Sequence, residues 1–373
     1  MAGVETVRDH TVLVVGGGIA GLATARALRH HGIEAHVVER AAGRLHAGAG
    51  VYLPSNAVRA LGGLGLQPAL LDRGREITKQ RFLNRRGRIL LDVDLADVWG
   101  PTEPCVAISH RDLHQLLGEG IPVRRGTTVT ALDDRGHQVH AVFDDGSTGD
   151  YHLVVGADGV HSWVRSHALA GDAPRFLRQV SWRFLTEELT DLAAWTVWLG
   201  HRCVFLAVPL GGGRTYCFAS VDSRAPADPS DGDPDRLAAL FDGFAEPIPT
   251  IVRHRSSRDR RPYFSPIEEV VHRPWVRGRI VLIGDAAHAT SPNMAEGVGM
   301  AVEDALVLAE TVAAGRPLTE FETSRLPRVR FVQTQTHRRD HTRNLPPIIR
   351  NSLLRLFGQQ IFRSNYKPLA TTP

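Results

Sequence analysis

The chain has 373 residues, 43% of them hydrophobic, which allows two connected domains around a sizeable core. Lys and Arg number 44 against 40 for Asp and Glu, and the formal charge of +4 is too small to indicate nucleic-acid binding. Cys105, Cys203 and Cys217 are odd in number and lack paired metal spacing, which argues against a disulfide framework and predicts reduced thiols in the cytoplasm.

The first elements predict a βαβ unit. Thr11 to Val15 is a β-branched run that ends at Gly16, too short for a signal peptide or a membrane span. An apolar-periodic stretch from Ile19 to Leu28 then stops at Gly32, as a helix with a C-terminal glycine does. Ala35 to Glu39 returns to strand character, so we expect the start of a parallel, doubly wound sheet.

The loop between this strand and helix carries a dinucleotide-binding pattern. Gly16, Gly18 and Gly21 form Gly-x-Gly-x-x-Gly, and the adjoining Ile19 and Ala20 open the helix whose free N–H groups attract phosphate. Glu39 and the adjoining Arg40 end the second strand, and Glu39 lies close to the expected position for a carboxylate that binds ribose. The carboxylate would repel a 2′-phosphate, so the site predicts the adenosine diphosphate part of FAD or NAD.

A second kind of segment interrupts the nucleotide-binding pattern. Residues 80–93 and 176–221 alternate as strands broken at Arg86-Gly87, Gly200-His201 and Gly211-Gly212-Gly213, which predicts antiparallel hairpins. Nucleotide-domain signals return at 153–158 and 279–285, so the two domains interleave. We therefore predict an α/β fold with an FAD-binding or NAD-binding Rossmann-like domain, a mainly antiparallel β-sheet substrate domain and C-terminal helices.

The domain boundaries follow from these changes of pattern. We assign 1–77, 102–174 and 272–325 to the nucleotide-binding domain, 78–101 and 175–271 to the substrate domain, and 326–373 to a C-terminal helical segment. In that segment Ile349, Leu353, Leu356 and Phe357 share one helical face. A membrane-surface role is conceivable, but a helix packed on its own domain is favoured, and no stable membrane association is expected.

Four motifs in order resemble flavoprotein monooxygenases of the para-hydroxybenzoate hydroxylase superfamily, in the branch of salicylate hydroxylase, urate hydroxylase and zeaxanthin epoxidase. The resemblance spans nearly the whole chain and selects FAD. Its pieces are Gly48-Ala49-Gly50-Val51 with Leu53-Pro54-Ser55-Asn56-Ala57, Ile108-Ser109-His110-Arg111-Asp112-Leu113, Val155-Gly156-Ala157-Asp158-Gly159, and Val281-Leu282-Ile283-Gly284-Asp285-Ala286-Ala287-His288.

The resemblance implies roles for individual residues. Asp285, at a strand end, binds the ribityl chain, and Asp158 touches the FAD and nicotinamide pyrophosphate regions. The start of a helix over 300–312 faces the flavin pyrimidine and stabilises negative charge on the reduced ring. The remaining predicted FAD-binding residues are Gly50, Val51, Arg111, Gln115, Val129, Gly297, Val298 and Gly299.

The chain departs from the family at the start of this helix. Many relatives have Gly-Gln-Gly where this chain has Ala295-Glu296-Gly297, and Asn where it has Gly299. We interpret Glu296 as a charge that complements the helix dipole rather than as a catalytic acid. His110 and His114 lie four residues apart on a helix predicted to be capped by Ser109, but no third ligand accompanies them, so no metal is expected.

The resemblance also implies the chemistry. NADPH or NADH reduces FAD, dioxygen forms a flavin C4a-hydroperoxide, and one oxygen passes to an aromatic or polycyclic substrate by hydroxylation or epoxidation. Pro292 lies beside the reacting carbon, and Arg183 orients the substrate unless it is a structural partner of Glu187 or Glu188. Trp182 and Phe184 share the opposite strand face, and Trp195 and Trp198 are interpreted as core aromatics.

Other functions remain open. A flavin-dependent halogenase is disfavoured because its Trp-x-Trp-x-Ile-Pro pattern is absent, and a plain NAD-dependent dehydrogenase leaves Asp158-Gly159 and Gly284-Asp285 unexplained. A flavoprotein that binds or oxidises a substrate without oxygen insertion stays an alternative. The expected partners are a small-molecule substrate and dioxygen, with no nucleic acid, in a monomer or homodimer.

Overall fold

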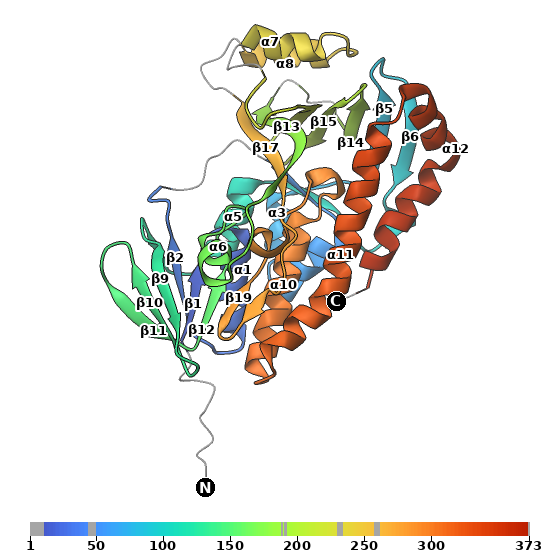
Figure 1. Ribbon diagram of the computed structural model, residues 1–373. Coiled ribbons are helices and arrows are strands. Elements are labelled where there is room, and N and C mark those ends of the chain that lie inside the picture. The colour runs from blue at the N-terminus through green and yellow to red at the C-terminus, as the bar shows by residue number, and fades with distance from the viewer. Residues whose placement is uncertain are drawn as a thin grey trace.

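The computed structural model describes residues 11–43, 50–187, 189, 192–229, 234–256 and 262–371 (Figure 1). Gly48 and Ala49 of the first family motif, and Glu188 as a possible partner of Arg183, lie outside these ranges. The mixed α/β architecture agrees with the predicted fold class.

A six-stranded sheet carries the dinucleotide motif. Its order is β18-β19-β12-β1-β2-β8, and all neighbours are parallel except the edge pair β18 and β19. Strand β1 lies between β2 and β12, where the strand order reverses, and ligands of such sheets bind beyond the carboxyl ends of the strands at this point. The strands are β1 (Val12–Val15), β2 (Ala35–Glu39), β8 (Val123–Arg125), β12 (Leu153–Gly156), β18 (Val276–Arg277) and β19 (Ile280–Leu282).

A seven-stranded sheet forms the second large layer, above the first in Figure 1. Its order is β17-β13-β16-β15-β14-β5-β6, antiparallel at every neighbour except the parallel pair β14 and β5. The prediction of a mainly antiparallel sheet is therefore confirmed. The strands are β5 (Lys79–Asn84), β6 (Ile89–Asp94), β13 (Arg175–Thr186), β14 (Trp195–Leu199), β15 (Cys203–Pro209), β16 (Thr215–Asp222) and β17 (Tyr263–Glu269).

The two faces of this sheet have different partners because side chains alternate along a strand. Trp182, Phe184 and Phe205 are buried on one face against α7 (Pro234–Phe241) and α8 (Ile248–Ser256). Arg183 points to the opposite face, as predicted. That face is turned toward the nucleotide-binding part of the molecule.

Among the described residues, two smaller sheets and six helices complete this part of the chain. One three-stranded sheet has the order β11-β10-β9 and the other β3-β7-β4. The strands are β3 (Gly50–Leu53), β4 (Arg75–Glu76), β7 (Val106–Ser109), β9 (Val129–Asp134), β10 (Val139–Phe143) and β11 (Thr148–Tyr151). The helices are α1 (Ile19–His30), α2 (Ser55–Gly63), α3 (Gln67–Arg73), α4 (Ala96–Trp99), α5 (His110–Gly118) and α6 (Trp163–Ala168).

The C-terminal part is helical, as the sequence indicates. Helices α9 (Asp285–His288) and α10 (Gly297–Ala313) belong to the nucleotide-binding part, and the long helices α11 (Leu318–Arg343) and α12 (Pro347–Tyr366) run side by side along one flank (Figure 1). Helix α11 begins at Leu318, several residues before the predicted helical segment. No helix in the described ranges is long and apolar enough to cross a membrane.

The expected packing face of α12 is wrong. Ile349, Leu356 and Phe357 are exposed, and the helix contacts the protein through other positions, such as Gly358 and Phe362. At Gly358 a Cβ atom would lie 2.9 Å from Leu91 of β6, so glycine permits the close approach of helix and strand. Close backbone approach, and not the apolar row, determines which face is buried.

Candidate functional site

The glycine loop after β1 has the geometry of a phosphate cradle. Gly16 has φ +112°, and a Cβ there would lie 2.3 Å from the carbonyl oxygen of Ala157. At Gly21 a Cβ would lie 1.9 Å from the carbonyl oxygen of Gly16, so only glycine lets α1 begin this close to the loop. Beside Gly18 the space is open, and no side chain caps the start of α1. The unpaired N–H groups of the first turn, at Ile19 and beyond, fit a pyrophosphate.

Glu39 is fixed beside this loop. Its two carboxylate oxygens accept hydrogen bonds from the backbone N–H of Gly17 and of Ala41, each at 2.8 Å. Each oxygen has a second lone pair, so the carboxylate can still accept from ribose hydroxyls. Arg40 is exposed next to it.

The Asp158-Gly159 motif has a structural role at the start of α6. The carboxylate of Asp158 accepts from the backbone N–H of Trp163 at 2.7 Å and of Val164 at 3.1 Å, and so caps α6. Buried Arg165 donates to the carbonyl oxygens of Val160 and Ala286, which joins this loop to the Asp285 turn. A contact of Asp158 with FAD or nicotinamide stays a prediction.

Asp285 follows β19 at a sharp turn. Gly284 has φ +56°, and a Cβ there would lie 2.9 Å from the Cβ of Ala20, so the turn sits against the start of α1. Asp285 opens onto the cavity described below. The surrounding protein raises the pKa of this carboxyl by desolvation, while His288 and Arg183 oppose the rise. A short, accessible carboxyl at this place suits the predicted contact with the ribityl chain.

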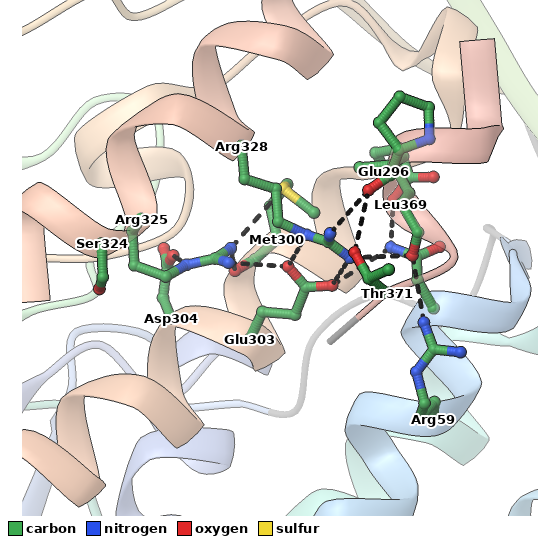
Figure 2. A network of polar contacts seen from close by, with 12 residues as sticks. Arg59, Glu296, Met300, Glu303, Asp304, Ser324, Arg325, Arg328, Leu369 and Thr371 are labelled. Atoms are coloured by element: carbon green, nitrogen blue, oxygen red, sulfur yellow. Dashed lines mark hydrogen bonds and ion pairs between the residues drawn. The ribbon is translucent and has the colours of Figure 1, made fainter. Parts of the chain in front are cut away.

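A buried cluster of charges holds the Asp285 turn in place. Figure 2 shows three of its members, Asp304, Glu303 and Arg325. Asp304 of α10 accepts from the backbone N–H of Gly284 at 3.0 Å, and its carboxylate also contacts His288 at 2.6 Å. Arg325 of α11 donates to Asp304 and to Glu303, both at 2.8 Å. Burial alone would raise the pKa of Asp304, but His288 and Arg325 hold this pKa well below its usual range.

Glu296 lies at the start of α10 and is only 1% exposed. Its Oε2 accepts from Nδ2 of Asn56 at 2.8 Å, whereas its Oε1 has no partner among the described atoms. Burial raises the pKa of this carboxyl to about 8, and Glu303 adds to the rise. The raised pKa favours the neutral form of Glu296, so its interpretation as a charge that complements the helix dipole stays a prediction.

The same pair accounts for the glycine at position 299. A Cβ on Gly299 would lie 3.1 Å from Oε2 of Glu296 and 3.2 Å from Nδ2 of Asn56. A side chain at position 299 would compete with the Glu296–Asn56 pair for the same space, and glycine leaves room for both.

A cavity of about 830 Å³ lies between the seven-stranded sheet and the nucleotide-binding part, within the range typical of small-molecule sites. It brings together the predicted site residues Gly50, Val51, Arg183, Asp285, Pro292, Gly297 and Val298. The remaining walls are mostly aliphatic and aromatic.

Arg183 is held at the wall of this cavity. It donates to Oγ of Ser265 at 2.9 Å and lies 5.5 Å from the ring centre of Phe218. Within the described ranges no carboxylate pairs with it, and Glu187, the described candidate partner, is exposed. A guanidinium in a mostly apolar cavity can bind an anionic or carbonyl group of a ligand.

Other predicted residues lie away from the cavity. Arg111 and Gln115 are exposed on α5, whose start Ser109 caps by accepting from the N–H of Asp112 at 3.0 Å. Val129 is buried at the start of β9, and Gly299 faces Asn56. Their contacts with FAD stay predictions.

His110 and His114 stack on each other, with their ring centroids 6.4 Å apart. His110 lines the cavity, where burial lowers its pKa, and Nε2 of His114 contacts the carbonyl oxygen of Gly17 at 2.8 Å. Within the described ranges no three His, Cys, Asp or Glu side chains come close enough to hold a metal ion.

Sequence reasoning missed several cavity residues. Trp195, interpreted as a core aromatic, lines the cavity with Tyr216 and Phe218. Strand alternation could have grouped Trp195 with the other inward residues of β14, but not told which face is the cavity. Arg339 of α11 donates to the carbonyl oxygen of Asn293 at 2.7 Å, beside Pro292, and no local pattern marks it.

Known proteins with the same features are numerous. The FAD binding domain family matches residues 9–317. A 3-amino-4-hydroxybenzoate 2-monooxygenase of Streptomyces cremeus is 33% identical over 91% of this chain and 89% of its own length. An aurachin C monooxygenase/isomerase of Stigmatella aurantiaca is 36% identical over 81% and 80%.

Solved structures agree with the sequence relatives. HpxO of Klebsiella pneumoniae, in complex with FAD and uric acid, superposes with a TM-score of 0.87 at 25% identity, covering 98% of this chain and 99% of that chain. The chain therefore belongs to the FAD binding domain family. As the motifs predict, it is a member of the para-hydroxybenzoate hydroxylase-like superfamily of FAD-dependent monooxygenases, and FAD is its cofactor.

Asp285→Ala should weaken FAD binding by roughly 10-fold or more, because a hydrogen bond to a charged group contributes about 1.5–3 kcal/mol. The thermal midpoint of the apoprotein should change little, since no core volume is lost. Flavin titration of the apoprotein measures the first effect, with exposed Glu310→Ala as the matched control. Equal FAD affinity in Asp285→Ala and wild type would refute the assignment.

Arg325→Ala should lower the free energy of unfolding by about 3–5 kcal/mol, because it leaves the buried carboxylate of Asp304 without its guanidinium partner and Glu303 with Arg328 alone. Arg316, which forms an ion pair with Glu310 at the surface, provides the control, and Arg316→Ala should change stability by less than about 1 kcal/mol. Urea unfolding monitored by circular dichroism distinguishes the two, and similar losses would contradict the argument.

Glu296→Gln should stabilise the protein at pH 9 and not at pH 4. The folded pKa of about 8 exceeds the ordinary value, so wild type loses stability as pH rises from about 4.5 to 8. Glutamine keeps the shape without the charge. A tenfold change in proton affinity corresponds to about 1.4 kcal/mol, so the difference at pH 9 should reach a few kcal/mol. Urea unfolding from pH 4 to pH 9 measures this difference in stability, with exposed Glu310→Gln as the control. A difference between Glu296→Gln and wild type that does not depend on pH would contradict the prediction.

Proposed function

We propose that this chain is an NAD(P)H-dependent FAD monooxygenase that inserts one oxygen atom into an aromatic or polycyclic substrate. The observation that carries the proposal is the cavity in which Asp285, Pro292 and Gly297 meet Arg183 and a wall of aromatic side chains. Relatives named for oxygenation of an aminohydroxybenzoate and of aurachin C support the same chemistry.

FAD would supply the redox chemistry, taking a hydride from NAD(P)H and activating dioxygen for transfer to the substrate. The glycine loop and Glu39 would hold its adenosine diphosphate part, and Asp285 its ribityl chain. The start of α10, at Gly297 and Val298, would direct unpaired N–H groups toward the negative charge of the reduced ring.

The protein would then position the substrate and exclude water. Arg183 has donors left after its bond to Ser265, and these can bind a phenolate, carboxylate or carbonyl oxygen in a fixed direction. Trp195 and Phe218 pack beside an aromatic ring and displace solvent. Fixing which carbon approaches the backbone at Pro292 favours oxygen insertion over release of hydrogen peroxide.

The test is a compound screen that follows NADH and NADPH oxidation, with product mass spectrometry under ¹⁸O-labelled dioxygen. Incorporation of one labelled atom into the product supports a monooxygenase. Substrate oxidation without label would favour the alternative, a flavoprotein that oxidises its substrate without oxygen insertion.

Arg183→Lys should keep FAD bound but weaken substrate binding, by roughly 10-fold, because lysine loses the planar pair of donors. It should also release more hydrogen peroxide per NAD(P)H consumed. Peroxide assays and substrate titration of the holoenzyme measure both. Arg81→Lys is the matched control, since Arg81 lies in the same sheet and pairs with Asp92. Normal coupling and affinity, or loss of folded protein, would assign Arg183 to structure.

A further inference from the structure

The sheet-side wall of the cavity is a continuous apolar surface. Alternate residues of neighbouring strands point to the same face, so the side chains form rows across β14 and β15. The row residues are Trp195, Val197 and Leu199 on β14 and Val204, Leu206 and Val208 on β15, and all six line the cavity.

One end of this wall lies at the flavin side. At Gly50, a predicted FAD-binding residue, a Cβ would lie 2.6 Å from the Cβ of Tyr216, and Tyr216 pairs with Val208. The wall continues along β15 to Val204, which pairs with Leu199 of β14. Four residues at about 3.4 Å each give a length of about 14 Å.

The far end is bordered by Arg350 and Arg343, which are bonded to the protein except at Nε of Arg343, an atom without a partner among the described residues. Arg350 is 1% exposed and donates to the carbonyl oxygens of Gly200, at 2.5 Å, and Leu199, at 3.2 Å. Arg343 pairs with Asp222 at 3.2 Å and donates to Gln179. These groups fix the end of the channel and join α11 and α12 to the sheet.

Helix α12 contributes Leu354 and Ile361 to the same cavity, and between them Gly358 rests on Leu91 of β6. Arg183 pairs with Phe218, which is in register with Leu206 and, through it, with Val197. Arg183 is therefore level with the middle of the apolar wall, two strands away from β15. An aromatic ring at Arg183 would leave Leu199, Val204 and Leu354 without a ligand.

We propose that the substrate is elongated: a polar aromatic head lies at Arg183, and an apolar extension lies along β14 and β15 beneath α12. The proposal rests on the proposed function for the reaction at the head. What it adds is a second binding region, lined by Leu199, Val204 and Leu354. This region binds alkyl or fused-ring carbon rather than a charged group.

A homologous series of 4-alkylphenols, from methyl to decyl, tests the extension. Isothermal titration of the holoenzyme should show the dissociation constant falling by about fourfold per added methylene, because each buried CH₂ is transferred from water. The fall should stop once the chain reaches the far end of the channel. A dissociation constant that does not depend on chain length would overturn the proposal.

Two variants narrow the channel without touching its flavin end. Val204→Phe and Leu354→Trp should raise the dissociation constant of 4-nonylphenol at least 10-fold and leave that of 4-methylphenol unchanged. Leu356→Trp is the matched control, because Leu356 is on the same helix but 72% exposed. Bound FAD and circular dichroism establish that each variant is folded. If only one of the two narrowing variants folds, that variant alone is enough for the test. An equal effect of the control, or equal effects on both phenols, would contradict the proposal.

Measuring binding and turnover separately distinguishes failure of the extended binding region from failure of the proposed reaction. NAD(P)H oxidation and ¹⁸O incorporation are measured on the same phenols. Chain-length dependence without turnover supports the channel and counts against the proposed reaction. Turnover without chain-length dependence supports the reaction and rejects the channel.

Discussion

The position of the candidate site depends on Asp304, a fully buried carboxylate whose charge must be met on every side. In a low-dielectric interior an unpaired charge is strongly destabilising, so its partners are fixed with it. Those partners are the N–H of Gly284, the His288 ring and the Arg325 guanidinium. They come from the turn after β19, from α9 and from α11, and the carboxylate itself comes from α10. One charge therefore sets the place at which Asp285 opens onto the cavity and the direction from which α10 reaches it.

Close backbone contacts also hold the parts of the site together. Gly284 lies against Ala20, and Gly21 lies over the carbonyl of Gly16, so motifs far apart in the chain meet at the start of α1. Arg165 adds a bond from the loop after β12 to Ala286 of α9. These contacts leave no room for a larger side chain. For this reason short motifs that contain glycine mark this site in the sequence.

The sequence predicted the parts of the site that local geometry determines. The run from β1 through α1 to Glu39 follows from hydrophobic period and glycine position, and the opposite faces of Trp182 and Arg183 follow from strand alternation. It could not assign Asp158, because a capping carboxylate and a ligand-binding carboxylate have the same local signature. It also misassigned the face of α12, because a row of apolar residues does not tell which side of a helix meets a strand. The buried face is the one that carries Gly358, which allows close contact with Leu91 in a distant segment.

The start of α10 shows how the protonation of one side chain bears on the chemistry of the whole cavity. An ionised Glu296 would offset the positive end of the helix dipole, which corresponds to roughly half an elementary charge. With its pKa raised to about 8 by burial, the group is largely neutral at pH 7, and the potential at Gly297 stays available to the cavity. Asn56 makes this arrangement possible by donating to Oε2, and Gly299 leaves room for both side chains. A neutral Glu296 therefore leaves the positive end of α10 directed at the cavity.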